Sequence, residues 1–341
     1  MSEKLVIVFL MVAAAMSLTL AAGCKTGMPR ASAPDARAAT GVPIILDTDI
    51  GTDVDDAGAL AMLHVLANRG EARILAVMSC NRNRWSAPAI DVINTYYGRG
   101  DIPIGSSRTG PDAEKWYHKR VPEFPHDLAA GSDAPDAVAL YRKILAAQPD
   151  KSVTIVTVGW LTNMADLLSS GPDRHSPHSG RDLVAAKVKE LVSMGGRWPN
   201  TPGQGDYNFR MDGPAAQKVA SGWPTPIMFS GLGIDVMTGA RLLAQGPGDN
   251  PVRAFYEGFL KTNNVPARSS WDHIAVLYAV RGLGDYFAAT TGGQCVAQKD
   301  GSNQWRSTPN KNHGYLKYKM PQARLAQVIE DLMLSPPQCP R

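Results

Sequence analysis

The stretch PIILDTDIGTDVDDA spans residues 43–57 and carries five aspartates within ten positions, at 47, 49, 53, 55 and 56. Its first four residues form an apolar run with two isoleucines, which is typical of a buried parallel strand. Residues 56–67 then place apolar side chains at helical spacing. The acidic residues are therefore predicted to lie in a turn that joins a strand to a helix.

The same alternation of strand and helix continues along the chain. Further strands are predicted at residues 74–79, 102–105, 153–158, 188–194 and 226–230, with two more near residues 296 and 316–318. Helices are predicted at residues 87–97, 135–147, 161–168, 212–220, 271–280 and 322–333. This order predicts an α/β domain with an open, mostly parallel, Rossmann-like sheet flanked by helices. Ligands bind at the carboxyl ends of the strands in such a sheet, and the acidic stretch follows the first strand.

The acidic stretch itself indicates a metal site. Five neighbouring carboxylates repel one another unless a cation neutralises them. Oxygen ligands without histidine or cysteine favour Ca²⁺ or Mg²⁺ over zinc, and Gly51 permits the tight turn that would gather them. The alternative is a solvated acidic loop in which Asp55 and Asp56 serve only as helix N-terminal acids, an interpretation that five aspartates fit poorly.

The first 24 residues are typical of an export signal. Lys4 precedes an almost unbroken apolar run over residues 5–22, and the segment ends LAAGC at Cys24. This pattern predicts a signal peptide with a lipobox, whose Cys24 would be acylated to anchor the chain in a membrane of the cell envelope. Ordinary cleavage of a secreted protein and an uncleaved anchor are the alternatives. Residues 25–41 are predicted to form a flexible linker, and residues 42–341 the domain.

Charge and cysteine content narrow the partners. The 341 residues have a formal net charge of +4 without a long basic run, so no nucleic-acid surface is indicated. Cys80 is expected to be a packed core residue. Cys295 and Cys339 could form a disulfide in an exported protein, although connectivity cannot be read from sequence. The oligomeric state stays open, a homo-oligomer included.

Five motifs, taken in order, resemble the inosine–uridine-preferring nucleoside hydrolase family. DTDIGTDVDDA at residues 47–57 is similar to the family's opening DTDxGxDDA with two additional residues. Asn81 resembles the Asn that follows the second strand, and GWLTN at residues 159–163 resembles a GPLTN turn. MGG at 194–196 with Asn200 and DYNF at 206–209 resembles an MGG…GN…EFN segment, and WDHIA at 271–275 resembles HDPLA. The resemblance covers the chain from about residue 43 to at least residue 279.

The resemblance implies an activity, a cofactor and a set of site residues. The activity would be calcium-dependent hydrolysis of the N-glycosidic bond of ribonucleosides or other small ribosides, as in nucleoside salvage. The calcium ligands would be Asp49, Asp56, Asp272 and the main-chain carbonyl of Val158, with Asp49 also acting as general base to a metal-bound water. The sugar hydroxyls would be held by Asp55, Asn200, Asp206 and Asn208, with Asn81 and Trp271 near the ring or base. Asp47 would brace the loop, and Asp53 has no counterpart in the family.

Two departures from the family pattern bear on catalysis. Asp206 stands where the family has a longer Glu, and Trp271 stands where many members have a His that protonates the leaving base. His273, two residues further along a helix, would point elsewhere. A nucleoside-binding protein that has lost or altered catalysis is therefore an alternative function. A phosphatase of the DxD type is a third, and it predicts a covalent phosphate on Asp47.

Overall fold

The first strand of the domain is β1, which runs over Val42–Thr48, pairs with β2 and β4, and carries the first part of the acidic stretch. The computed structural model describes residues 41–113, 119–200, 205–308 and 311–337. These residues belong to one compact unit, Ala36–Arg341. The predicted signal segment, Cys24, nearly all of the predicted linker and Cys339 lie outside the described residues.

Nine strands within the described residues form a single sheet. They are β1 Val42–Thr48, β2 Ala72–Ser79, β3 Ile104–Ser106, β4 Val153–Thr157, β5 Val188–Met194, β6 Ile227–Ser230, β9 Phe287–Ala297, β10 Asn303–Ser307 and β11 His313–Tyr318. Their order is β10-β9-β11-β6-β5-β4-β1-β2-β3. All neighbouring strands from β3 to β11 are parallel, and β9 is antiparallel to both β10 and β11. The predicted open, mostly parallel sheet is confirmed.

The order of the first six strands determines where a ligand can bind. The chain moves outward from β1 through β2 to β3, then returns to β4 on the other side of β1 and continues to β5 and β6. The direction of strand addition thus reverses between β1 and β4, and such a switch point leaves a crevice at the carboxyl ends of the two strands. Asp49 follows β1 and Val158 follows β4, so both lie at this crevice.

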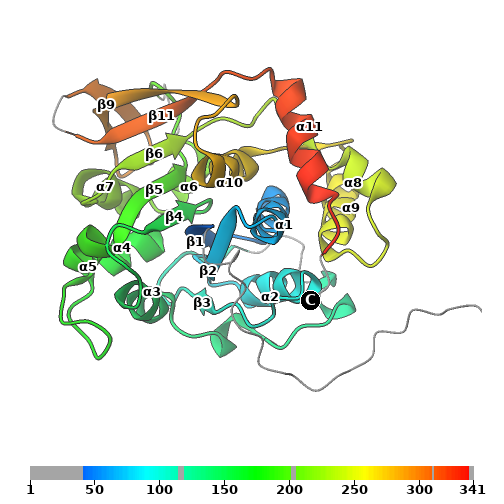
Figure 1. Cartoon of the computed structure of the whole chain (residues 1–341), viewed down its shortest axis with the longest axis horizontal. Coiled ribbons are helices and arrows are strands. Elements are labelled where there is room, and N and C mark those ends of the chain that lie inside the picture. The colour runs from blue at the N-terminus through cyan, green and yellow to red at the C-terminus, as the bar shows by residue number, and fades with distance from the viewer. Residues whose placement is uncertain (1–40, 114–118, 201–204, 309–310, 338–341) are drawn as a thin grey trace, which may run out of the picture. The chain divides into compact units, whose positions relative to one another are not determined.

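Helices cover both faces of the sheet (Figure 1). One face carries α3 Ala137–Ala146, α4 Thr162–Ser169, α5 Gly180–Lys187 and α7 Gly213–Gly222. The other carries α1 Asp55–Asn68, α2 Ser86–Tyr96 and α10 Trp271–Arg281, with α11 Gln322–Met333 packed against α1. The mostly apolar sequence of α1, buried from Asp55 to Leu66, explains its position, because a helix that is apolar on most sides needs neighbours on most sides.

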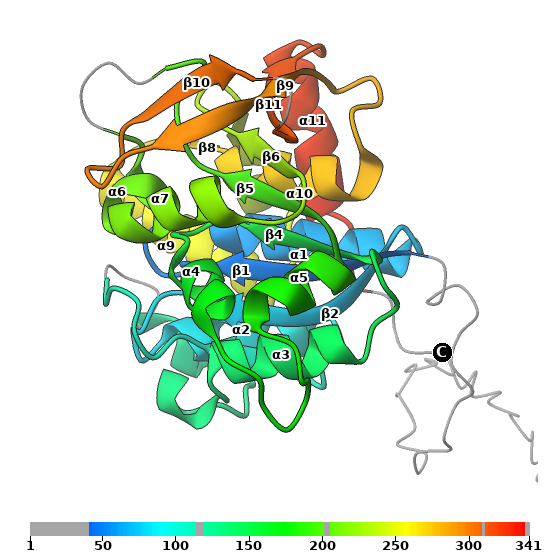
Figure 2. The same cartoon turned by 90° about the vertical axis from the view of Figure 1, so that its left-hand side faces the viewer.

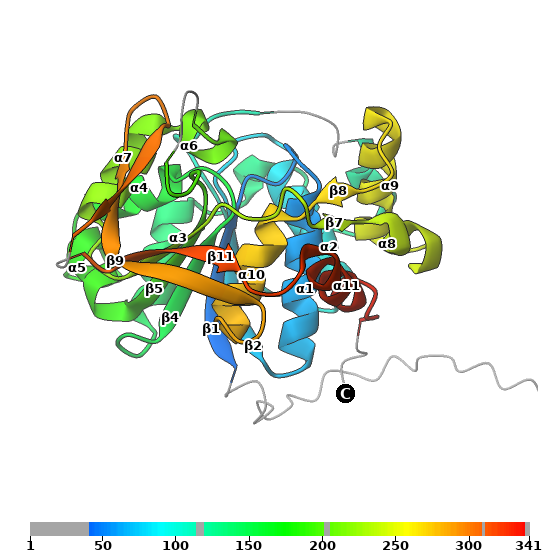
Figure 3. The same ribbon diagram turned by 90° about the horizontal axis from the view of Figure 1, so that it is seen from above.

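The C-terminal third departs from simple alternation. β9, β10 and β11 extend the sheet at one end (Figure 2). The segment between β6 and α10 holds α8 Ala240–Gln245, α9 Pro251–Asn263 and a separate two-stranded sheet, β7 Met237–Thr238 with β8 Arg268–Ser269 (Figure 3). These elements were not predicted from sequence. No helix in the described part of the chain is long and apolar enough to cross a membrane.

Candidate functional site

The turn after β1 is anchored by a buried aspartate. The Asp47 carboxylate accepts hydrogen bonds from the Tyr141 hydroxyl at 2.8 Å and the Asn163 amide at 2.9 Å. The main-chain N–H of Val158 donates to the Asp47 carbonyl at 2.8 Å. Burial raises the pKa of Asp47 to about 7, although these donors oppose the shift. Asp47 therefore holds the end of β1 against α3, α4 and the end of β4, which is the bracing role expected for it.

Hydroxyl groups fold the acidic stretch back on itself. Thr48 accepts a hydrogen bond from the Ile50 N–H at 3.1 Å and donates to Asp56. Thr52 donates to Asp49 at 2.7 Å. Gly51 has a φ of 109°, a left-handed conformation that a residue with a side chain rarely adopts. The tight turn predicted at Gly51 is present, and it directs several carboxylates into one place.

Two of these carboxylates come together with a third from a distant part of the sequence. Asp55 and Asp56 begin α1, and Asp272 lies in the first turn of α10. One oxygen from each lies within 4.8 Å of the others, and each residue is at most 3% exposed. The N–H of Asp272 donates to Asp55 at 3.3 Å, which fixes the two helix ends relative to each other.

The electrostatics of this carboxylate group, defined as Asp55, Asp56 and Asp272, favour a bound cation. Burial and the charges of neighbouring aspartates raise the pKa of all three well above its ordinary value. Arg268 lowers the pKa of Asp55, but its guanidinium is already paired with Asp53. Buried carboxylates are stable when paired or when they coordinate a metal. An all-oxygen donor set of this kind fits a hard divalent cation such as Ca²⁺.

Asp49 lies beside this group rather than within it. Its carboxylate is 3% exposed, accepts the Thr52 hydrogen bond and lies within hydrogen-bonding reach of Asp56. Burial raises the pKa of Asp49 to about 7. The structure thus unites two of the predicted ligands, Asp56 and Asp272, adds Asp55 to them, and places Asp49 next to them.

Residues from α6 Tyr207–Met211 close the site between β4 and β5. The Asn208 side-chain amide donates to the Val158 carbonyl at 2.8 Å and to the Met194 carbonyl at 3.3 Å. Asp206 caps α6 through the Phe209 N–H at 3.2 Å and also accepts a hydrogen bond from the Gly196 N–H. Burial raises the pKa of Asp206 to about 6. Asn208 thus contacts the carbonyl predicted as a ligand and joins the ends of both strands.

Comparison with known proteins identifies the family of this chain. A family model described as inosine-uridine preferring nucleoside hydrolase matches residues 44–315. The chain belongs to this family.

Individual relatives of the family are distant. The pyrimidine-specific ribonucleoside hydrolase RihA of Shewanella sp. (strain ANA-3) is 31% identical over 217 residues, which cover 59% of this chain and 61% of that protein. RihA of Escherichia coli O81 (strain ED1a) is 29% identical over 207 residues, covering 57% and 61%. The chain thus spans about three fifths of the length of these curated relatives.

Solved structures agree on the fold. The plant nucleoside hydrolase PpNRh1 matches with a TM-score of 0.64 at 18% identity, covering 86% of this chain and 99% of that one. An inosine-guanosine nucleoside hydrolase matches with a TM-score of 0.64 at 19% identity, covering 85% and 98%. At this identity the likeness shows that the fold is shared.

The remaining predicted site residues are held by loops. Asn81 is buried, and its side chain donates to the Ala113 carbonyl at 2.8 Å and accepts from the N–H groups of Asn83 and Ala113. Asn200 is exposed, and its side-chain oxygen accepts from the Trp305 N–H on β10 at 3.1 Å. The structure therefore shows a loop-shaping role for Asn81 and a contact with β10 for Asn200.

The two residues that decide leaving-group chemistry differ sharply in environment. Trp271 is half-buried at the start of α10, next to Asp272. His273 is fully buried, and its two ring nitrogens have no hydrogen-bond partner among the described residues. Burial lowers the pKa of His273 to about 3, so its ring is neutral at physiological pH. His273 packs close to Gly58 of α1.

Tyr207 is a site residue that sequence reasoning missed. Tyr207 is 37% exposed, and burial of its hydroxyl, followed by the charges of Asp49 and Asp56, raises its pKa to about 12, whereas a hydrogen bond with Thr52 opposes this shift. Tyr207 therefore lies near these carboxylates at the solvent side. Its position between Asp206 and Asn208 in the sequence was the available signal.

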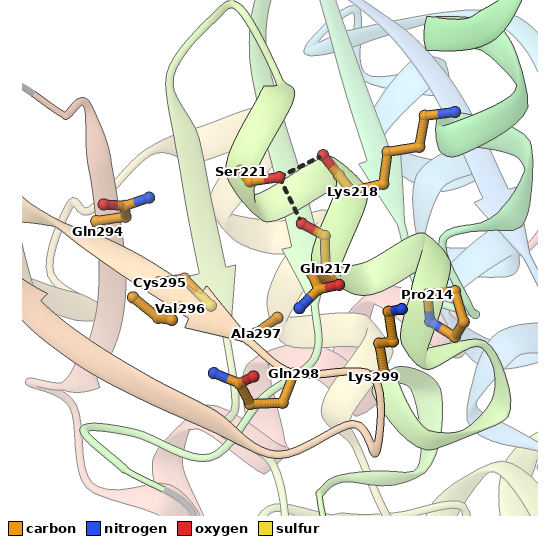
Figure 4. A pocket seen from close by; sticks show the side chains of 10 residues that line it. All are labelled: Pro214, Gln217, Lys218, Ser221, Gln294, Cys295, Val296, Ala297, Gln298 and Lys299. Atoms are coloured by element: carbon orange, nitrogen blue, oxygen red, sulfur yellow. Dashed lines mark hydrogen bonds between the residues drawn. The ribbon is translucent and has the colours of Figure 1, made fainter.

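Two surface clefts lie apart from these residues. One, of about 380 Å³, runs between α7 and β9 and is lined by Lys218, Cys295 and Lys299 among others (Figure 4). The second, of about 530 Å³, lies among α2, residues 120–125 and the start of α9. Neither is lined by any of the predicted site residues. Cys295 is buried at the first cleft and has no disulfide partner among the described residues, and Cys80 is buried as expected.

Proposed function

We propose that this protein is a calcium-dependent N-glycosidase that cleaves ribonucleosides into ribose and a free base. The observation that carries the proposal is the buried carboxylate group at the β1–β4 switch point of a nucleoside hydrolase family member. Ligand binding at such switch points is a general property of open α/β sheets. The carboxylate group provides the charge, and Asp49 beside it provides a base.

The cofactor would be held by Asp56 and Asp272, with Asp49, Asp55 and the Val158 carbonyl around it. When bound, calcium supplies positive charge that orients two neighbouring ribose hydroxyls and a water molecule. A cation at this place also lowers the pKa of the nearby aspartates, so that they are ionised at neutral pH.

Asp49 is the residue that takes up the proton of the attacking water. Its second oxygen is oriented by Thr52, and the carboxylate is shielded from solvent. A general base must be ionised and within hydrogen-bonding reach of the proton that it removes. The hydrogen bond from Thr52 fixes the orientation of Asp49, and Tyr207 is hydrogen-bonded to Thr52 in turn.

The sugar would be held by Asp55, Asp206 and Asn208. Glycoside cleavage passes through a transition state with positive charge on the sugar ring. Ionised Asp206 and the dipole of the Asn208 amide lie at the ends of β4 and β5, where they can stabilise that charge. We propose that Asn200, on the exposed segment near β10, and Asn81 complete the contacts to the sugar and base.

Departure of the base has no proton donor at position 271 to assist it. Trp271 has no ionisable proton, and His273 is buried and neutral. Stacking of the base on the Trp271 ring would stabilise the leaving group through its π-system. A nucleoside-binding protein without turnover is the second candidate, and the absence of a histidine at position 271 is the observation that favours it.

The proposed function is tested by chromatography of the products formed from inosine, uridine, adenosine and guanosine. The wild-type protein with calcium is expected to release free base from at least one of them. Asp49→Asn should lower kcat by at least 100-fold, since general-base catalysis contributes about that factor. Asp212→Asn serves as the matched control, because Asp212 caps α7 outside the carboxylate group. Tight nucleoside binding without any release would support the second candidate instead.

We further propose that the protein is exported and lipid-anchored through Cys24. The apolar run over residues 5–22 followed by LAAGC supports this location. Metabolic labelling with a fatty-acid analogue is expected to mark the wild-type chain and to leave Cys24→Ser unlabelled. Labelling of the Cys24→Ser variant, or equal release of both into the medium, would contradict lipidation at Cys24.

A further inference from the structure

Asp53, the one aspartate of the acidic stretch without a counterpart in the family, is paired with a residue far away in the sequence. Arg268 donates from Nε to both Asp53 oxygens at 3.0 Å, and its Nη2 contacts the same carboxylate. Two guanidinium nitrogens on one carboxylate form a pair of defined geometry, unlike a single contact between flexible side chains. Arg268 lies on β8, and the neighbouring Ser269 hydroxyl donates to the Ile234 carbonyl at 2.9 Å.

The same guanidinium contacts the faces of two aromatic rings. Its central carbon is 4.8 Å from the centroid of the Trp271 ring and 5.3 Å from that of Phe259 on α9. Planar guanidinium groups are attracted to aromatic faces by charge and by stacking. Arg268 is thus held by Asp53, and it in turn covers one face of Trp271.

The contact with Arg268 restricts the rotamers of the Trp271 side chain more than its own helix does. Trp271 is half-buried at the first position of α10, where few neighbouring turns limit its rotamers. A ring fixed in one orientation before binding loses less conformational entropy when a ligand stacks on it. Asp53 lies two residues before Asp55, so the Asp53–Arg268 pair also ties the ring to the carboxylate group.

We propose that Arg268, held by Asp53, is a positioning residue that fixes the Trp271 ring in the orientation that receives the nucleobase. This inference rests on the proposed function, since it assigns the base side of the same site. Arg268 acts through Trp271 and does not itself contact the substrate.

A double-mutant cycle separates this role from its alternatives. Arg268→Gln and Trp271→Phe are made singly and together, and KM, kcat and the inhibition constant of free ribose are measured in saturating calcium. Arg268→Gln is expected to raise the KM for nucleosides about tenfold and to change the ribose inhibition constant less than twofold. In the Trp271→Phe background, Arg268→Gln should have no further effect. Asp53→Asn should reproduce the Arg268→Gln phenotype.

Each other outcome overturns the proposal. An equal effect of Arg268→Gln in both backgrounds would mean that Arg268 contacts the base directly. Parallel changes in nucleoside KM, ribose inhibition and calcium affinity would mean that the pair only supports the fold. Unchanged KM would mean that Trp271 needs no support. Arg241→Gln is the matched control, because Arg241 is similarly exposed and its partners Glu330 and Asp331 lie on α11.

Failure of the proposed function gives a different result from failure of this inference. A wild-type protein that binds nucleosides without releasing base contradicts the proposed N-glycosidase activity. In that case the double-mutant cycle is evaluated with nucleoside dissociation constants in place of KM. A wild-type protein that binds no nucleoside contradicts both. If the wild type turns over nucleosides but the effects of Arg268→Gln and Trp271→Phe are additive, only the proposed role of Arg268 is contradicted.

Discussion

Substitution of Asp272 by asparagine separates two effects of the carboxylate group. Without calcium, the three carboxylates repel one another and destabilise the folded protein. With calcium, they bind the ion and stabilise it. Asp272→Asn keeps the shape of the side chain and removes its charge. The N–H of Asp272 that donates to Asp55 is part of the main chain and is retained. The variant is therefore expected to be more stable than the wild type without calcium and to gain less from calcium.

The magnitude follows from the distances within the group. Two unit charges 4.8 Å apart repel by about 3 kcal/mol at an effective dielectric constant of about 20. Because nearby polar groups and relaxation of the site screen part of this repulsion, removing one charge is expected to relieve about 1–3 kcal/mol. At a scale of roughly 2–4 °C per kcal/mol, the calcium-free variant should melt about 2–12 °C above the calcium-free wild type.

Calcium should reverse this advantage. A ligand present at 100 times its dissociation constant stabilises a folded protein by about 2.7 kcal/mol, and at a concentration equal to that constant by about 0.4 kcal/mol. A 100-fold loss of affinity on removal of one of three carboxylates would therefore abolish most of the calcium-dependent shift. Thermal unfolding is measured at pH 7.5 in a chelator and at a series of calcium concentrations.

Asp91→Asn provides the matched control for this series. Asp91 is an equally buried aspartate on α2 that accepts hydrogen bonds from the N–H groups of Asp127 and Leu128. Its substitution should lower stability equally with and without calcium. A calcium-free Asp272→Asn protein that is less stable than the wild type, or one with an undiminished calcium shift, would refute the assignment of a cation site to this group.

Three further substitutions test other parts of the structure. Tyr207→Phe removes the hydroxyl bonded to Thr52 and should lower kcat/KM about fivefold without changing calcium affinity, whereas an unchanged kcat/KM would place Tyr207 outside the site. His273→Gln removes an imidazole whose pKa is about 3 in the folded protein and 6.5 in the unfolded chain. Protons therefore bind preferentially to the unfolded chain as the pH falls. Between pH 7.5 and 5, the free energy of unfolding of the wild type should fall by about 2 kcal/mol more than that of the variant. Urea unfolding at both pH values checks this, and equal losses in the two proteins would contradict it. Gly58→Ala places a methyl group against His273 and the Tyr256 hydroxyl and should lower the free energy of unfolding by about 1–3 kcal/mol. Gly222→Ala is the control and should not destabilise the protein, because Gly222 has open space around it. Equal denaturation midpoints for the two variants would refute this packing.

The fold was predictable because its determinants are local. Short apolar runs such as residues 153–158 and 188–194 differ clearly from helical spacing, and their alternation with helices specifies a parallel sheet. The strands β7 and β8 are two residues each and show no periodicity from which to predict them. Helix α9 does carry local signals in its sequence, with Asn250 as its cap and Pro251 at its first position.

The site was predictable only in part, because its geometry depends on packing between distant segments. The density of aspartates indicated a cation, and the motif at residues 271–275 indicated Asp272. The approach of Asp272 to Asp55 requires α1 and α10 to pack side by side, which no local pattern encodes. The partner of Asp53 is 215 residues away, so its role could not be read from the acidic stretch.

The central claim is tested most directly by measuring ribose release from a panel of ribonucleosides with calcium, after chelation, and after calcium is restored. The account predicts release with calcium, loss of release in the chelator, and recovery on restoration. Because chelation leaves the chain intact, recovery also shows that the protein did not unfold irreversibly. Release that continues undiminished in the chelator, or no release from any nucleoside while calcium is bound, would contradict a calcium-dependent N-glycosidase.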